Sequence, residues 1–132
     1  MGDGLERLLR PATLAHLEGA IVLLCGVLFY RQLGASWLLF ALLLLAPDLA
    51  ALGYVAGPRI GAACYNCAHT ALLPAALLAF GLLAGESLAL ALAAIWFAHI
   101  GIDRLAGYGL KETPPTRQDM LSNATPDGLI SR

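Results

Sequence analysis

The chain has 132 residues, of which 59% are hydrophobic and 13% are charged, with a formal net charge of −1 at pH 7. This length allows one domain at most, and a soluble domain so small could not hide that much apolar surface from water. The balanced charge gives no electrostatic basis for a nucleic-acid partner. We therefore expect membrane lipids to surround most of the chain.

Four apolar stretches are long enough to cross a bilayer, whose hydrocarbon core requires about 20 helical residues. Short links that contain glycine or proline separate them, so consecutive spans are expected to run in opposite directions. The predicted fold is all-α, a four-transmembrane-helix up-down bundle in residues 13–108, after an N-terminal segment 1–12 and before a flexible tail 109–132. The predicted spans are residues 13–33, 36–56, 61–84 and 86–106. Pro47 and Pro74 fall inside the second and third of these spans, where kinks are tolerated.

The distribution of positive charge predicts the orientation in the membrane, because short cytoplasmic loops are enriched in lysine and arginine. With four spans both termini lie on the same side, and the opposite side carries Arg31 alone. Both termini are therefore expected in the cytoplasm. The basic residues on that side are Arg7, Arg10, Arg59, Arg104, Lys111, Arg117 and Arg132.

Polar side chains interrupt the apolar spans, and the predicted topology places them at one depth. At about 1.5 Å of helical rise per residue they lie roughly 5–12 Å below the cytoplasmic boundary. An ionisable group within the hydrocarbon costs about 2.5–3.5 kcal/mol on insertion scales, so these groups are expected to face one another rather than lipid. The set comprises Glu18, Asp48, Tyr65, Asn66, His69, His99 and Asp103.

This mixture of imidazoles and carboxylates predicts a divalent metal, because such ligands suit Zn²⁺, Fe²⁺ or Mn²⁺. A catalytic zinc ion typically has three protein ligands and an open position for water, and we expect His69, His99 and Asp48 to be those ligands. Glu18 and Asp103 are expected to act as the general base or to orient a histidine. The residues expected to orient substrate or ligands, or to line the pocket, are Tyr65, Asn66 and Trp96.

Two shorter motifs allow other interpretations. The C-x-x-C spacing of Cys64 and Cys67 is expected to reflect packing, because cytoplasmic thiols stay reduced and a thioredoxin-like motif requires a βαβ unit. The spacing of Gly53 and Gly57 is typical of close helix contact and allows a homodimer.

The chain carries, in this order, the motifs Leu17-Glu18-Gly19, Ala46-Pro47-Asp48-Leu49, Gly53-Tyr54, Gly57-Pro58-Arg59, Tyr65-Asn66, His69-Thr70, Pro74, His99-Ile100-Gly101-Ile102-Asp103-Arg104 and Gly107-Tyr108-Gly109-Leu110-Lys111. This series resembles a family of small bacterial integral membrane proteins that is known only as a domain of unknown function. The resemblance implies a four-helix fold in the bacterial inner membrane and implies no activity. A looser similarity, in the Pro-Asp and His-Thr pairs, is to membrane-bound metal-dependent hydrolases.

The expected function is a metal-dependent hydrolase that acts on a lipid or amphiphile reaching the site from the cytoplasmic leaflet. Three alternatives remain open at this point. The same acids and histidines could bind or transport a small molecule, an ion or protons, or the two histidines could ligate a haem. The polar layer could also serve a structural or partner subunit that has no catalytic role.

Overall fold

The computed structural model describes residues 4, 6, 9–117 and 120, and this part of the chain contains helices and no strand. The predicted all-α class is therefore confirmed. In chain order the elements are α2 (Pro11–Gln32), α3 (Trp37–Leu43), the 3₁₀ helix η1 (Ala46–Ala56), α4 (Pro58–His69), α5 (Leu72–Ala84) and α6 (Ser87–Ala106).

The first and fourth predicted spans are continuous helices. Helix α2 begins at Pro11, whose fixed φ suits the first helical position. Helix α6 ends before Gly107, which adopts the left-handed conformation (φ 89°) that commonly terminates a helix. Both helices lie within two residues of the predicted bounds, 13–33 and 86–106, at each end.

The second and third predicted spans are broken, and a proline explains each break. A proline ring clashes with the carbonyl four residues earlier in a helix. For Pro47 that residue is Leu43, the last residue of α3, and for Pro74 it is Thr70, which follows the last residue of α4. Helices α4 and α5 consequently meet at an angle of 41° instead of forming the expected continuous span.

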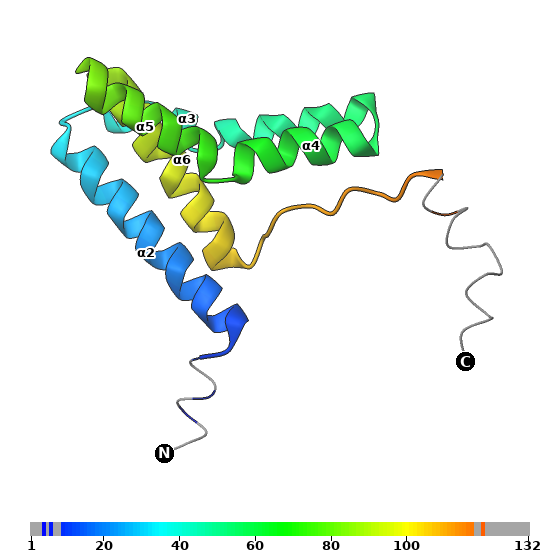
Figure 1. The fold of residues 1–132 in the computed structure, drawn as a ribbon. Helices are drawn as coiled ribbons and strands as arrows, with labels where there is room; N and C mark the ends of the chain where they lie inside the picture. Colours follow the sequence, from blue (N-terminus) through cyan, green and yellow to red (C-terminus); the bar gives the residue numbers. More distant parts are fainter. Residues whose placement is uncertain (1–3, 5, 7–8, 118–119, 121–132) are drawn as a thin grey trace.

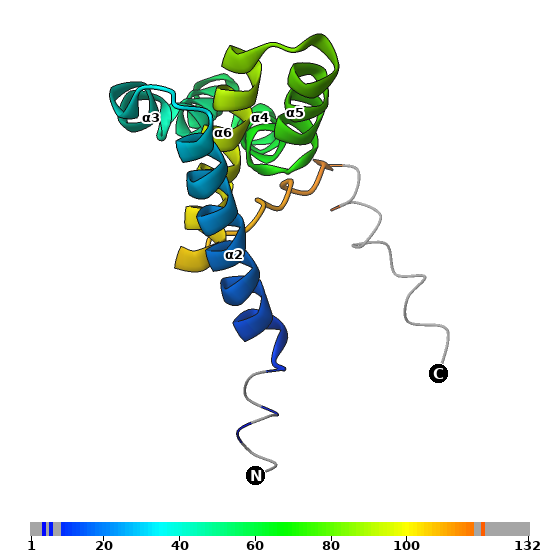
Figure 2. The ribbon, with the colours of Figure 1, turned by 90° about the vertical axis from the view of Figure 1, so that its left-hand side faces the viewer.

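The helices form a small bundle from which one hairpin projects. Helices α2 and α6 lie side by side, α5 packs on α6, and η1 pairs with α4 in a hairpin that points away from α2 (Figures 1 and 2). Within the described residues, three segments are long and apolar enough to cross a membrane, namely Pro11–Gln32, Trp37–Ala56 and Ser87–Ala106. The bent pair α4–α5 makes a fourth if it counts as one span. This composition is that of a membrane protein.

Glycines bring α2 and α6 into close contact. A Cβ atom on Gly101 would lie 2.5 Å from the backbone nitrogen of Leu23, and one on Gly26 would lie 3.0 Å from the carbonyl oxygen of Ala94. Small residues at helix interfaces are typical of membrane proteins, where close backbone approach replaces hydrophobic burial as the source of association. Helix α6 is thereby the buried centre of the bundle, while leucines on the other helices point outward, as Leu83 does with 89% of its surface exposed.

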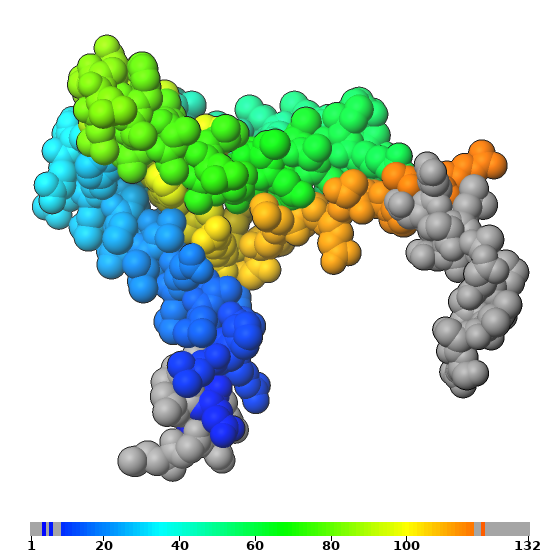
Figure 3. All heavy atoms as spheres, in the orientation of Figure 1, coloured from blue at the N-terminus to red at the C-terminus, as the bar shows by residue number. Residues whose placement is uncertain are grey.

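The chain after α6 lies along α4 and forms what we call the C-terminal segment, residues 107–117 (Figure 3). The side-chain amide of Asn66 donates to the carbonyl of Lys111 and accepts from its N–H, both at 2.7 Å. Arg59 donates to the carbonyl of Pro115 at 3.0 Å. The beginning of the predicted flexible tail 109–132 is thus held against α4, and residues 118–119 and 121–132 of that prediction lie outside the described residues.

Candidate metal centre

Four of the predicted polar residues meet where the projecting hairpin joins the bundle. Asp48 comes from the first turn of η1, His69 is the last residue of α4, and His99 and Asp103 lie one turn apart on α6. One ligand atom from each of the four lies within 4.8 Å of the others. The two proline-induced breaks therefore place an acid and a histidine beside α6.

The closest atoms of this cluster are all metal-ligating atoms. Nε2 of His69 lies 3.1 Å from Nε2 of His99, 3.3 Å from Oδ1 of Asp48 and 3.2 Å from Oδ2 of Asp103. Nε2 of His99 lies 3.5 Å from the same oxygen of Asp48 and 3.4 Å from that of Asp103. Four ligands at bond lengths of about 2.0–2.2 Å around a tetrahedral ion lie about 3.3–3.6 Å apart. The five separations that involve a histidine, 3.1–3.5 Å, are close to that range, and the two carboxylate oxygens lie within 4.8 Å of each other.

The other nitrogen of His69 fixes which tautomer faces the cluster. Nδ1 of His69 lies 2.8 Å from the carbonyl oxygen of Tyr65. A carbonyl only accepts hydrogen bonds, so Nδ1 carries the proton and donates it, and Nε2 of the neutral ring presents its lone pair to the cluster. A backbone carbonyl on the remote nitrogen is a usual partner of metal-binding histidines.

Asp103 supplies a second indication of an ion. Its Oδ2 atom is buried and has no hydrogen-bond partner among the described residues, although both imidazole Nε2 atoms are within 3.4 Å. Buried polar atoms in proteins nearly always have a partner, and an exception calls for an explanation such as an ion. A cation between the carboxylate and the two rings would satisfy this oxygen.

The cluster contains Asp103 and lacks Glu18, although both were predicted as the base or orienting group. Glu18 has 63% of its side chain exposed and accepts a hydrogen bond from Arg104 at 2.9 Å. The sequence places Glu18 at a suitable depth, but the glycine face of α2 turns towards α6 and directs Glu18 to Arg104. Oδ2 of Asp103, in contrast, lies 3.2 Å from Nε2 of His69 and 3.4 Å from Nε2 of His99.

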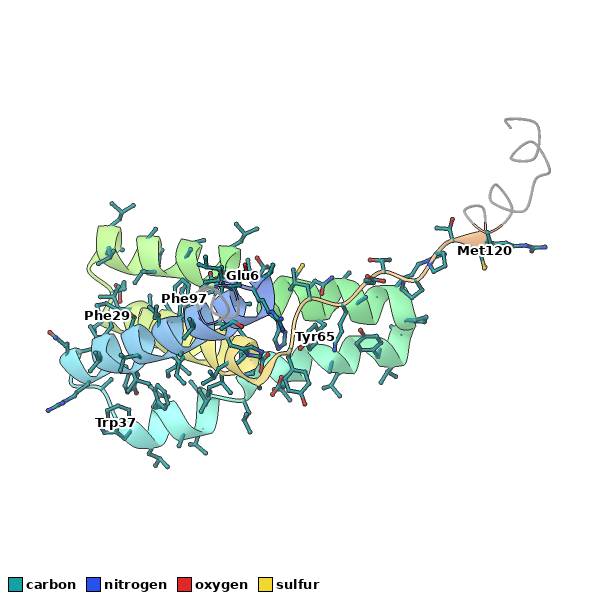
Figure 4. The ribbon with its side chains drawn as sticks, turned by 90° about the horizontal axis from the view of Figure 1, so that it is seen from below. Glu6, Phe29, Trp37, Tyr65, Phe97 and Met120 are labelled. Atoms are coloured by element: carbon teal, nitrogen blue, oxygen red, sulfur yellow. The ribbon has the colours of Figure 1, made fainter. Side chains whose placement is uncertain are left out.

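Tyr65 and Asn66, predicted to orient substrate or ligands, contact the protein itself. The Tyr65 ring stacks on His69 with centroids 3.8 Å apart and an interplanar angle of 9°. The Nζ atom of Lys111 lies over the Tyr65 ring, 5.2 Å from its centroid. Figure 4 shows Tyr65 beside the C-terminal segment. Tyr65 therefore holds the imidazole in place, and the amide of Asn66 is occupied by the Lys111 backbone.

Trp96, predicted to line the pocket, stabilises the broken end of α4. The last carbonyls of a helix have no partner within the helix. The indole N–H of Trp96 donates to the carbonyl of Ala68 at 2.6 Å, and the N–H of Thr70 donates to the carbonyl of Asn66 at 3.0 Å. The bond from Trp96 thus positions the residue that immediately precedes His69.

If the cluster holds a divalent metal ion, we expect Trp96→Phe to weaken its binding by about 10-fold, the lower end of the effect of losing a residue that orients a metal ligand. The phenyl ring retains the aromatic packing but leaves the Ala68 carbonyl without its donor. Competition with a chromophoric chelator measures the affinity. Trp37→Phe is the matched control, because Trp37 packs on Tyr30 far from the cluster and should leave the affinity unchanged. Equal affinities for both variants would contradict this role.

We expect Asn66→Ala to release the C-terminal segment. Two hydrogen bonds to Lys111 disappear, and each contributes about 0.5–1.5 kcal/mol, so protection of the Lys111 amide from hydrogen exchange should fall by about 10-fold or more. Cys67→Ala, a neighbouring exposed position, serves as the control. Unchanged exchange at Lys111 in Asn66→Ala would show that the segment is held by other contacts.

A membrane-associated helical protein with a His₂Asp₂ cluster able to hold a metal ion is the class that this fold and site define. The chain belongs to the family described as "Domain of unknown function (DUF4260)", whose model matches residues 12–123. This confirms the predicted resemblance to a family of unknown function. No curated protein and no solved structure matches the chain, so the looser similarity to metal-dependent hydrolases has no support from these comparisons.

Proposed function

We propose that this protein is a membrane metalloprotein that holds one divalent transition metal between Asp48, His69, His99 and Asp103. The observation that carries the proposal is the convergence of one ligand atom from each residue within 4.8 Å, with the five separations that involve a histidine at 3.1–3.5 Å. Two carboxylates also balance the charge of a divalent ion, which matters within a membrane, where an uncompensated charge is costly. Zinc fits best, because it favours four tetrahedral nitrogen and oxygen ligands and binds more tightly than Fe²⁺ or Mn²⁺.

The exposure of the ligands supports a reactive centre over a purely structural one. The side chains of His69 and His99 are 4% and 2% exposed, whereas that of Asp48 is 51% exposed. Asp48 is therefore the ligand that solvent can replace. A cavity of about 40 Å³ beside His69 and Asp103 adds room for water.

We propose hydrolysis as the reaction. A divalent metal supplies an activated water molecule at neutral pH and polarises the bond that is attacked. In this chain Asp48 would accept the proton of the attacking water, His99 and Asp103 would keep the centre in place from α6, and Tyr65 would fix the His69 ring. Both termini would lie in the cytoplasm of a bacterium, with the centre near the inner leaflet, as the distribution of basic residues favours.

Metal analysis of the protein purified in detergent tests the proposal. We expect one zinc ion per chain, and chelation should lower the thermal unfolding temperature until zinc is restored. A ligand at 100 times its dissociation constant stabilises the folded state by about 2.7 kcal/mol. Substoichiometric metal after equilibration with zinc, together with an unfolding temperature that zinc does not change, would overturn it.

A second candidate function is movement of the metal ion across the membrane, and the two broken helices favour it. Discontinuous membrane helices with ends at a shared site are typical of ion and substrate binding in transporters. Proteoliposomes loaded with a zinc-sensitive dye decide between the two. Zinc influx that depends on His69 would indicate transport. If the protein binds zinc but the dye inside the proteoliposomes detects no influx, the metalloenzyme remains the function.

A further inference from the structure

An apolar groove of about 390 Å³ lies beside the metal centre. Its volume falls within the range of small-molecule sites, about 300–1,000 Å³. The groove lies between the two broken spans and α6, and the broken spans present alanine, leucine and proline side chains to it. Residues that line it include Ala46, Pro47, Ala50, Ala68, Ile95 and Trp96.

One end of the groove is lined by residues that neighbour the metal ligands along the chain. Pro47 immediately precedes Asp48, Ala68 immediately precedes His69, and Ile95 lies one turn before His99 on the same face of α6. A molecule that lies in the groove therefore has one end at the cluster. No charged residue lines the groove.

The lining is suited to a hydrocarbon chain. The side chains that surround the groove are aliphatic except for Trp96, and the indole N–H of Trp96 is already bonded to Ala68. A cavity that offers no free polar partner stays dry and accepts apolar groups. Polar and metal-binding chemistry is confined to the end at Asp48 and His69.

We infer that the groove binds the hydrocarbon chain of a single-chain amphiphile whose oxygen-bearing head group reaches the metal. This inference rests on the proposed metal centre and names the class of substrate that it would take. The apolar wall and the charged end match the two parts of such a molecule. Its entry from the surrounding lipid requires no aqueous path, because α3 and η1 contain no buried residue and border the groove directly.

Two hydroxamic acids separate binding to the metal from binding to the groove. Tetradecanohydroxamic acid carries a long chain and acetohydroxamic acid carries none, while both present the same zinc-binding head. The hydrocarbon chain of the long probe is already in an apolar environment, a micelle or bilayer, before it enters the groove. Its binding therefore depends on how well it fits the shape of the groove and not on removal of apolar surface from water. A variant that fills the groove is therefore the informative comparison.

Ala50→Leu fills the groove from η1, and Ala51→Leu is its matched control, because Ala51 is exposed on the same helix and does not line the groove. We expect Ala50→Leu to weaken the long probe at least 10-fold and to leave the short probe and the zinc content unchanged. Ala51→Leu should leave both probes unchanged. Equal binding of the long probe to both variants would overturn the inference, as would an equal loss of both probes in Ala50→Leu.

A photoactivatable long-chain carboxylate distinguishes failure of this inference from failure of the metal proposal. If purified protein holds no zinc and binds neither hydroxamate, the metal proposal fails. Labelling of residues 46–50 and 95–96 in that metal-free protein, reduced in Ala50→Leu but not in Ala51→Leu, would still support the groove. Labelling spread evenly over the outer faces of the helices would reject it.

Discussion

His69→Ala is expected to bind zinc at least about 100-fold more weakly than the unmodified protein, beyond the 10–100-fold that loss of an orienting partner costs. Nε2 of His69 is within 3.3 Å of a ligand atom from each of the other three residues. Its removal would take away one of the four residues proposed to hold the ion and also the ring on which Tyr65 stacks. His99→Ala should have an effect of similar size. Competition with a chelator of known affinity measures both.

His16→Ala is the matched control for these variants. His16 is also a histidine near the end of the bundle, but its Nδ1–H donates to the carbonyl of Leu105 at 2.8 Å and it stands outside the cluster. Its zinc affinity should equal that of the unmodified protein. Equal affinities for His16→Ala, His69→Ala and His99→Ala would mean that zinc binds elsewhere.

Gly101→Ala is expected to lower the free energy of unfolding by about 3 kcal/mol, the upper end of the usual cost of overpacking. The new Cβ atom would lie 2.5 Å from the nitrogen of Leu23 and 2.8 Å from the carbonyl oxygen of Gly19. These are backbone atoms, so only a shift of α2 relative to α6 relieves the clash. Thermal or denaturant unfolding in detergent measures the change.

Gly109→Ala provides the corresponding control, because a Cβ atom there meets no heavy atom within 4 Å. It should leave stability unchanged within about 0.5 kcal/mol, as is usual for surface substitutions. Since His99 and Asp103 flank Gly101 on α6, zinc affinity should fall in Gly101→Ala and stay constant in Gly109→Ala. A fully stable Gly101→Ala would refute the close contact of α2 with α6.

Hydropathy and the positions of proline and glycine predict much of the fold from the sequence. The bounds of α2 and α6 follow from apolar runs of membrane length and from the residues that begin and end them, Pro11 and Gly107. Pro47 and Pro74 fall in the two spans that are not continuous α-helices. The extent of the break at Pro74 was underestimated, because the clash falls on Thr70, four residues earlier, and divides the span into α4 and α5.

The depth of a side chain in the membrane could be predicted by counting residues along its helix. The direction in which the side chain points around the helix could not. Counting placed Asp48, His69, His99, Asp103 and Glu18 in one layer, and the structure brings the first four together. Helices that are apolar on nearly every side do not reveal which face meets a neighbour. The close approach of α2 to α6 through their glycines settled that Glu18 meets Arg104.

The amino-acid sequence by itself determined that this chain is helical, that it suits a membrane, and which acids and histidines interrupt its apolar spans at a common depth. The tertiary structure alone decided which of them meet, that the amide of Asn66 holds the C-terminal segment, and that Trp96 supports the end of α4. The physical reason is that hydrophobicity and proline act locally along the chain. The separation of two ligand atoms depends instead on the bend at each break and on the packing of helices remote in sequence.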